Sequence, residues 1–136
     1  MLHEDIIPEK YLPTFNSTTI EMFLCKIKWL SEHFIYFNDD MFPVMSHSMN
    51  DFFIDGKPVY ELVRQSTCKN SFRRQCRNSY RLACKCLGMH DNSQDYLYIR
   101  HSATPLLKSS CEEVWEKAED KIFDSITRFR EPFNYT

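Results

Sequence analysis

The sequence contains very little glycine, with only two glycines among 136 residues. Tight turns that need positive φ depend on this residue, because it has no Cβ to clash with the backbone. A β-architecture built on many tight turns is therefore disfavoured. A compact domain with substantial helix fits the composition better.

Two further features are missing from the sequence. No stretch approaches about 18 consecutive apolar residues, so we expect no segment to span a membrane. The first ten residues, MLHEDIIPEK, lack the basic segment and apolar run of a secretory signal. We therefore expect an intracellular protein, in the nucleus or the cytoplasm. The six cysteines should stay reduced in such a compartment, so structural disulfides are disfavoured.

The apolar content is sufficient for one hydrophobic core. Hydrophobic residues make up 43% of the chain and aromatic residues 15%, which argues against a disordered chain. A length of 136 residues fits one domain. We expect an extended lead-in over residues 1–16, because it contains Pro8 and Pro13, and a single globular domain over residues 17–136.

Apolar residues at three- and four-residue spacing predict three amphipathic helices, at about 18–33, 70–87 and 110–130. Two of them begin with a capping-box pattern, Thr18 with Glu21 and Ser110 with Glu113. The predicted fold class is α+β and mainly helical, with the three helices packed around a few short strands.

The strand signals lie between these helices. HFIYFNDDMFPVM predicts a short strand, a turn at Asn-Asp-Asp and a second extended piece. A strand should end at Ile54, with a turn at Asp55-Gly56 and then a short helix that has Pro58 in its first turn. Residues 91–93 predict a further turn, and Tyr96–Ile99 a further strand.

The charge distribution has one strong asymmetry. Residues 62–90 contain seven Lys and Arg and no acid, whereas the rest of the chain has ten basic and nineteen acidic residues. Arg73, Arg77, Arg81 and Lys85 follow one another at four-residue spacing, which predicts a basic ridge along one helix. Because like charges at this spacing repel, the ridge needs compensation. It can come from the acidic helix around residues 112–120, from an acidic partner or from phosphates.

These patterns favour a non-enzymatic binding domain, an adaptor or regulatory module without a cofactor. In this interpretation the ridge holds an acidic protein or nucleic-acid phosphates, because guanidinium groups bind both. A second, aromatic surface lies between residues 34 and 60. A homodimer is a further option, because an acidic and a basic helix can pair between copies. The predicted partner-binding residues are Arg73, Arg74, Arg77, Arg81, Lys85, Phe52, Phe53 and Tyr60.

Two alternatives stay open at this point. One is a sequence-tolerant DNA- or RNA-binding domain, although the pI of about 6.2 is low for that class. The other is a small thiol- or zinc-dependent enzyme that uses Cys76, Cys84, Cys86 and His90, although Cys84 and Cys86 point apart on a helix. The carboxylate pairs Asp39-Asp40 and Glu112-Glu113 are interpreted as turn and helix-start residues.

Overall fold

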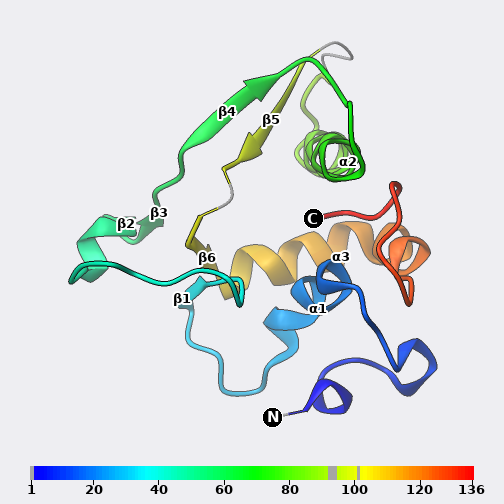
Figure 1. Cartoon of the computed structure of the whole chain (residues 1–136), viewed down its shortest axis with the longest axis horizontal. Helices are drawn as coiled ribbons and strands as arrows, with labels where there is room; N and C mark the ends of the chain where they lie inside the picture. Colours follow the sequence, from blue (N-terminus) through cyan, green and yellow to red (C-terminus); the bar gives the residue numbers. More distant parts are fainter. Residues whose placement is uncertain (1, 92–94, 101) are drawn as a thin grey trace.

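The computed structural model describes residues 2–91, 95–100 and 102–136. Within these ranges lie three α-helices and three two-stranded antiparallel sheets (Figure 1). The helices are α1 (Ser17–Phe23), α2 (Ser71–Cys86) and α3 (Lys108–Ser125). The paired strands are β1 (His33–Tyr36) with β6 (Thr104–Leu107), β2 (Phe53–Ile54) with β3 (Lys57–Pro58), and β4 (Leu62–Gln65) with β5 (Tyr96–Ile99). Four 3₁₀ turns complete the described elements, η1 (His3–Asp5), η2 (Glu9–Tyr11), η3 (Leu24–Lys26) and η4 (Met49–Asp51).

The main core lies where α3 meets the N-terminal third of the chain. Its buried members come from the lead-in, α1, η3 and α3 together with the residue that follows it; they are Ile7, Phe23, Cys25, Trp115, Ile122 and Ile126. The Trp115 indole also donates a hydrogen bond of 2.8 Å to the Met22 carbonyl, which fixes α3 against α1. A smaller apolar contact forms where α2 packs on β5, with Cys76 and Tyr96 buried. No helix in the described ranges combines the length and apolarity that a membrane crossing needs.

The prediction of a mainly helical fold is wrong, because the protein is about 40% helical and 15% strand. The largest error is the first helix, expected to reach residue 33, which ends at Phe23 and continues only as η3. Tertiary contacts extend the backbone after Ile27. The Lys108 ammonium lies 3.5 Å from the Ile27 carbonyl, and the Lys108 amide donates to the Glu32 carbonyl at 2.8 Å. These contacts and the β1–β6 pairing override the local helical periodicity.

The helix starts also differ from the capping-box predictions. Asn16 is the N-cap of α1, and its side-chain oxygen accepts from the Thr18 amide at 3.2 Å. Because α3 begins at Lys108, Ser110 lies inside its first turn and does not cap it. Farther along, Ala118 interrupts the helix with φ of −140°. The second helix agrees best with prediction, since α2 occupies 71–86 of the expected 70–87.

The strand predictions are confirmed in three places. The short strand predicted in HFIYFNDDMFPVM is β1, β2 ends at Ile54, and β5 has the predicted bounds. Asp55 and Gly56 have φ of 51° and 73°, the positive pair that a type I′ hairpin turn requires. The short helix after this turn is wrong, because Pro58 belongs to β3. The predicted turn over 91–93 lies mostly outside the described residues.

A buried pair of asparagine side chains joins the two ends of the chain. The Asn16 amide donates to Asn134 Oδ1 at 3.1 Å and to Thr127 Oγ1 at 3.2 Å, while its oxygen caps α1. The Asn134 amide donates in turn to the Ser125 carbonyl and to Thr127 Oγ1. Both asparagines are at most 1% exposed. This network connects the lead-in to the segment after α3.

We expect Asn16→Ala to lower the free energy of unfolding by about 2–4 kcal/mol, because it removes a helix cap and leaves Asn134 Oδ1 with the Glu131 amide as its remaining donor. Urea unfolding should show a lower midpoint with an unchanged slope. The matched control is Asn50→Ala, at an exposed position, which should change stability by less than about 0.5 kcal/mol. Equal effects of the two substitutions would contradict the assigned role of Asn16.

Candidate functional site

Polar side chains from three distant parts of the chain meet at the end of β1. Tyr36 is the last residue of this strand, and its hydroxyl lies 3.2 Å from Glu21 Oε1 and 2.8 Å from Asn38 Oδ1. Glu21 comes from α1, and Asn38 opens a turn in which the Met41 amide donates to the Asn38 carbonyl. One phenol therefore connects α1 to the turn after β1.

Charged groups surround this phenol. Burial raises the pKa of Tyr36 well above its ordinary value of 10, and the neighbouring Glu21 and Asp39 carboxylates raise it further. The Arg130 guanidinium acts on this pKa in the opposite direction, so it too lies within electrostatic range. Arg130 also donates a hydrogen bond to the Ser17 hydroxyl. We name this cluster the polar site, and its members are Ser17, Glu21, Tyr36, Asn38, Asp39 and Arg130.

Local geometry explains how these residues converge. Ser17 and Glu21 are four residues apart on α1, so they share one face of the helix. The segment that carries Arg130 runs beside the lead-in, because the Phe15 amide donates to the Arg128 carbonyl at 2.8 Å. The buried Asn16–Asn134 network lies along the same contact. The site therefore requires both ends of the chain.

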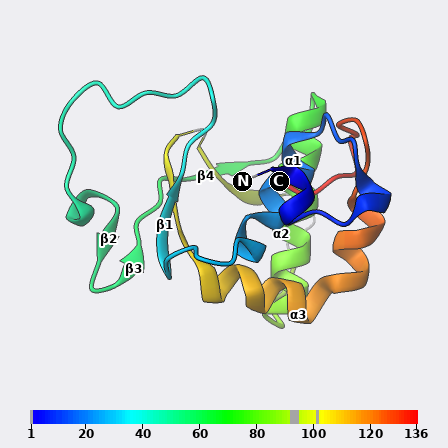
Figure 2. The same cartoon turned by 90° about the horizontal axis from the view of Figure 1, so that it is seen from below.

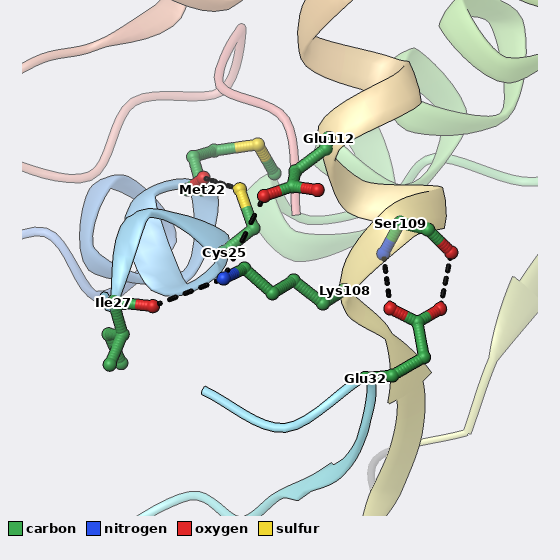
Figure 3. A network of polar contacts seen from close by, with 7 residues as sticks. All are labelled: Met22, Cys25, Ile27, Glu32, Lys108, Ser109 and Glu112. Atoms are coloured by element: carbon green, nitrogen blue, oxygen red, sulfur yellow. Dashed lines mark hydrogen bonds and ion pairs between the residues drawn. The ribbon is translucent and has the colours of Figure 1, made fainter. Parts of the chain in front are cut away.

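A second set of contacts fixes the start of β1 against α3 (Figure 3). The Glu32 carboxylate accepts from the Ser109 amide at 3.2 Å and from the Ser109 hydroxyl. Since Leu107 provides no side-chain cap to α3, Glu32 supplies an acceptor and a negative charge at that helix start. In the same view the Lys108 side chain reaches the Ile27 carbonyl and the Glu112 carboxylate. These contacts hold β1, and with it Tyr36, in place.

In the structure, some side chains of the predicted basic ridge contact other parts of the chain, and others are exposed. The Arg73 guanidinium stacks 4.2 Å from the centre of the Tyr98 ring, and Arg77 contacts the Cys68 sulfur at 3.8 Å. Arg81 forms an ion pair with Asp91 at 3.2 Å. Arg74 and Lys85 are exposed. Part of the ridge is thus compensated within the chain, and a role of these residues in binding a partner stays a prediction.

The predicted aromatic surface is also partly internal. Phe53 is buried and contacts the His33 ring at 5.0 Å, while Phe52 and Tyr60 are half-buried. The chain between β1 and β2 forms a wide arc away from the helices (Figure 2), and Phe42 and Val44 on this arc are exposed. Binding by Phe52, Phe53 and Tyr60 stays a prediction as well.

The cysteines do not form the cluster that a zinc or thiol site needs. All six are unpaired, and within the described residues no group of three His, Cys, Asp or Glu side chains is placed to hold a metal ion. Burial raises the pKa of Cys76 and of Cys111 to about 11, and it also raises the pKa of Cys25. This shift opposes thiolate formation, so these thiols are poor nucleophiles at neutral pH.

Comparison with known proteins identifies the class of protein to which the chain is similar. The family described as Stealth protein CR2, conserved region 2, matches residues 1–60. Capsular polysaccharide phosphotransferase fcs1 of Haemophilus influenzae is 38% identical over 138 residues, 94% of this chain and 37% of the relative. Cps1A, a capsular polysaccharide phosphotransferase of Actinobacillus pleuropneumoniae, is 34% identical over 125 residues, 88% of this chain and 34% of the relative. Exopolysaccharide phosphotransferase cps2G of Lactiplantibacillus plantarum is 54% identical over 57 residues, 41% of this chain and 17% of the relative.

These relatives are enzymes. The interpretation as a non-enzymatic adaptor or regulatory domain is therefore wrong, because the similar proteins are named for a transferase activity. The same finding contradicts the alternatives of a nucleic-acid-binding domain and of a thiol or zinc enzyme. The chain spans only about a third of the length of the curated capsular relatives it matches at 34–38% identity.

None of the six polar-site residues is among the residues that the sequence predicts for a site. The sequence assigns Glu21 to a capping box, and Asn38 and Asp39 to a turn. The signal that sequence analysis missed is a carboxylate turn that directly follows a strand, where side chains at the end of a β-strand often point into a site. Arg130 had no such signal, because it approaches Ser17 only through the folded contact between the chain ends.

We expect the pKa of Tyr36 to fall towards its ordinary value in Glu21→Gln, because the substitution removes a negative charge that disfavours the phenolate. NMR titration of ¹³C-labelled tyrosine should show this shift. Because the folded-state pKa is raised, Tyr36 contributes stability below pH of about 10 that is lost as the pH rises through the folded pKa. Glu112→Gln should leave the Tyr36 titration unchanged, and an unchanged titration in Glu21→Gln would contradict the contact.

We expect Glu32→Ala to lower the free energy of unfolding by about 1 kcal/mol, because α3 loses the acceptor at its N-terminus. Thermal unfolding followed by circular dichroism would measure the change. Glu119→Ala removes an exposed acid of α3 that is not at the helix start, so it should be nearly neutral. If Glu32→Ala changed the stability as little as this control, the contact between Glu32 and Ser109 would not contribute to stability.

Proposed function

We propose that this chain forms part of a saccharide phosphotransferase, with the polar site binding and transferring a sugar phosphate. The observation that carries this proposal is the series of contacts from Arg130 to Ser17 on α1, and from Glu21 on the same face of α1 to the Tyr36 hydroxyl. Five of the six polar-site residues lie within the 1–60 region that the family matches. The names of the relatives support the reaction class.

The residue types fit the requirements of phosphoryl transfer. Such reactions depend on positioning and on electrostatic stabilisation of phosphate oxygens, because little covalent chemistry falls to the protein. Arg130 is exposed and offers a planar set of donors that matches phosphate oxygens. Its hydrogen bond to Ser17 orients this group at the start of α1. We assign the phosphate-binding role to Arg130 and Ser17.

The carboxylates suit the proton transfer in the same reaction. In the proposed step the hydroxyl oxygen of a saccharide acceptor forms a bond to the phosphorus of an activated sugar-phosphate donor. The bond from that phosphorus to the leaving group breaks, and the leaving group departs with its electron pair. The acceptor proton passes to Asp39, an exposed carboxylate that follows β1. Tyr36 and Glu21 are positioning residues, because they hold the turn that carries Asp39.

The donor groups at this turn also fit magnesium. Mg²⁺ in phosphoryl-transfer sites is usually held by one or two carboxylates together with the phosphates of the substrate. Asp40 offers an exposed carboxylate of this kind next to Asp39, which takes the acceptor proton. Bound Mg²⁺ would neutralise charge on the phosphate oxygens.

We expect Arg130→Gln and Asp39→Asn each to reduce sugar-phosphate transfer by about 100-fold or more, because each removes a group that acts on the reacting phosphate. The assay would incubate the full chain with a panel of nucleoside diphosphate sugars and an oligosaccharide acceptor. Formation of a phosphodiester would be followed by ³¹P NMR.

The matched controls are Arg74→Gln and Asp120→Asn, which remove exposed charges of the same kind on α2 and α3. Both should retain wild-type transfer. Wild-type transfer by Arg130→Gln would refute the phosphate-binding role of the polar site.

A further inference from the structure

A pocket of about 200 Å³ lies beside the polar site, between the lead-in and the segment after α3. Figure 2 shows these two segments together at the end of the molecule opposite the β1–β2 arc. Asn16 connects the two, because its side chain donates to Thr127 of the pocket lining and it directly precedes Ser17 of the polar site. Its lining residues are Lys10, Tyr11, Leu12, Pro13, Ile126, Thr127 and Arg128.

Two cations at the rim of this pocket have no ion-pair partner among the described residues. The Lys10 ammonium lies 4.7 Å from the centre of the Tyr11 ring, and the Arg128 guanidinium lies 5.5 Å from that of Phe15. Within the part of the chain that the structure describes, neither cation forms an ion pair with a carboxylate, and this includes Glu9 next to Lys10. A cation on an aromatic face keeps donors for an external anion.

Two exposed aromatic rings extend the same surface towards the polar site. Phe15 and Phe129 stack with their centres 5.7 Å apart and their planes 14° apart, yet they remain 66% and 60% exposed. Phenylalanine rings stacked in this way are usually buried, because their apolar area is large. Their outer faces suit the C–H face of a sugar ring. Phe129 is adjacent in sequence to the exposed Arg130, and Phe15 lies two residues before Ser17, so the surface borders the polar site.

We propose that Lys10, Arg128, Phe15 and Phe129 form an acceptor subsite for an anionic sugar unit of a polysaccharide. This inference rests on the proposed function, since it assigns the acceptor of the same reaction. The two cations bind a phosphate or carboxylate on the sugar, and the phenylalanine pair packs against the ring. A polymer acceptor extends beyond the reacting hydroxyl, so it contacts surface next to the polar site. The sugar-phosphate donor, in contrast, needs to contact only the polar site.

The experiment is a titration of the ¹⁵N-labelled full chain with glucose 6-phosphate as a model of the anionic sugar unit. We expect it to shift the amide signals of residues 10–15 and 127–129. UDP-glucose, a model of the donor, should shift the signals of residues 17, 36–39 and 130. Neutral glucose should bind at least tenfold more weakly than glucose 6-phosphate, because it offers no group to the cations.

The double variant Lys10→Gln/Arg128→Gln should weaken glucose 6-phosphate binding by about tenfold or more. The matched control Lys28→Gln/Lys85→Gln removes two exposed cations elsewhere and should bind as wild type. Phe15→Ser should weaken binding of both glucose and glucose 6-phosphate. Because all three positions are exposed, circular dichroism should show an unchanged fold.

The outcomes separate this inference from the proposed function. If the double variant binds glucose 6-phosphate as wild type, or if UDP-glucose shifts residues 10–15, the acceptor subsite is overturned. Loss of transfer in Arg130→Gln would still support the polar site in that case. If glucose 6-phosphate binding depends on Lys10 and Arg128 while Arg130→Gln transfers normally, the subsite stands as a sugar site and the assigned phosphate-transfer role fails.

Discussion

The hydrogen bonds between Asn16 and Asn134 are the constraint on which the arrangement of this molecule depends. Each amide is buried, so its donors and acceptors must be satisfied within the protein. The Asn16 side-chain oxygen accepts a hydrogen bond from the Thr18 amide of α1, and its nitrogen donates one to Asn134 near the other end of the chain. A side chain that makes hydrogen bonds to two segments fixes their relative position more strictly than apolar contact does, because hydrogen bonds are directional.

The polar site inherits its geometry from this constraint. Ser17 follows Asn16 directly, and Arg130 lies four residues before Asn134, so the pairing of the asparagines brings the guanidinium to the start of α1. The Glu32–Ser109 contact acts in the same way on the other side, since it holds β1 and therefore Tyr36. Charged groups that would repel or drift apart in solution are thus held by neutral hydrogen bonds around them.

The sequence predicted those parts of the fold that local interactions determine. α2 has a continuous apolar row, and the Asp55-Gly56 turn has the backbone preference that its conformation needs, so the sequence predicts both. The end of α1 was not found, because the pairing of β1 with residues about 70 positions away decides it. The same reason explains the site. Tyr36, Glu21 and Arg130 each have an ordinary local interpretation, and distant contacts bring them together in the polar site.

The dependence on both chain ends has a consequence for the region that the family matches. Residues 1–60 include Ser17, Glu21, Tyr36, Asn38 and Asp39, but groups that hold α1 and the lead-in in place come from residues 115–134. An excised fragment of those first sixty residues would keep the recognisable signature while exposing Asn16 and half of the apolar core to water. The fold around the polar site therefore depends on a longer part of the chain than the stretch that the family matches.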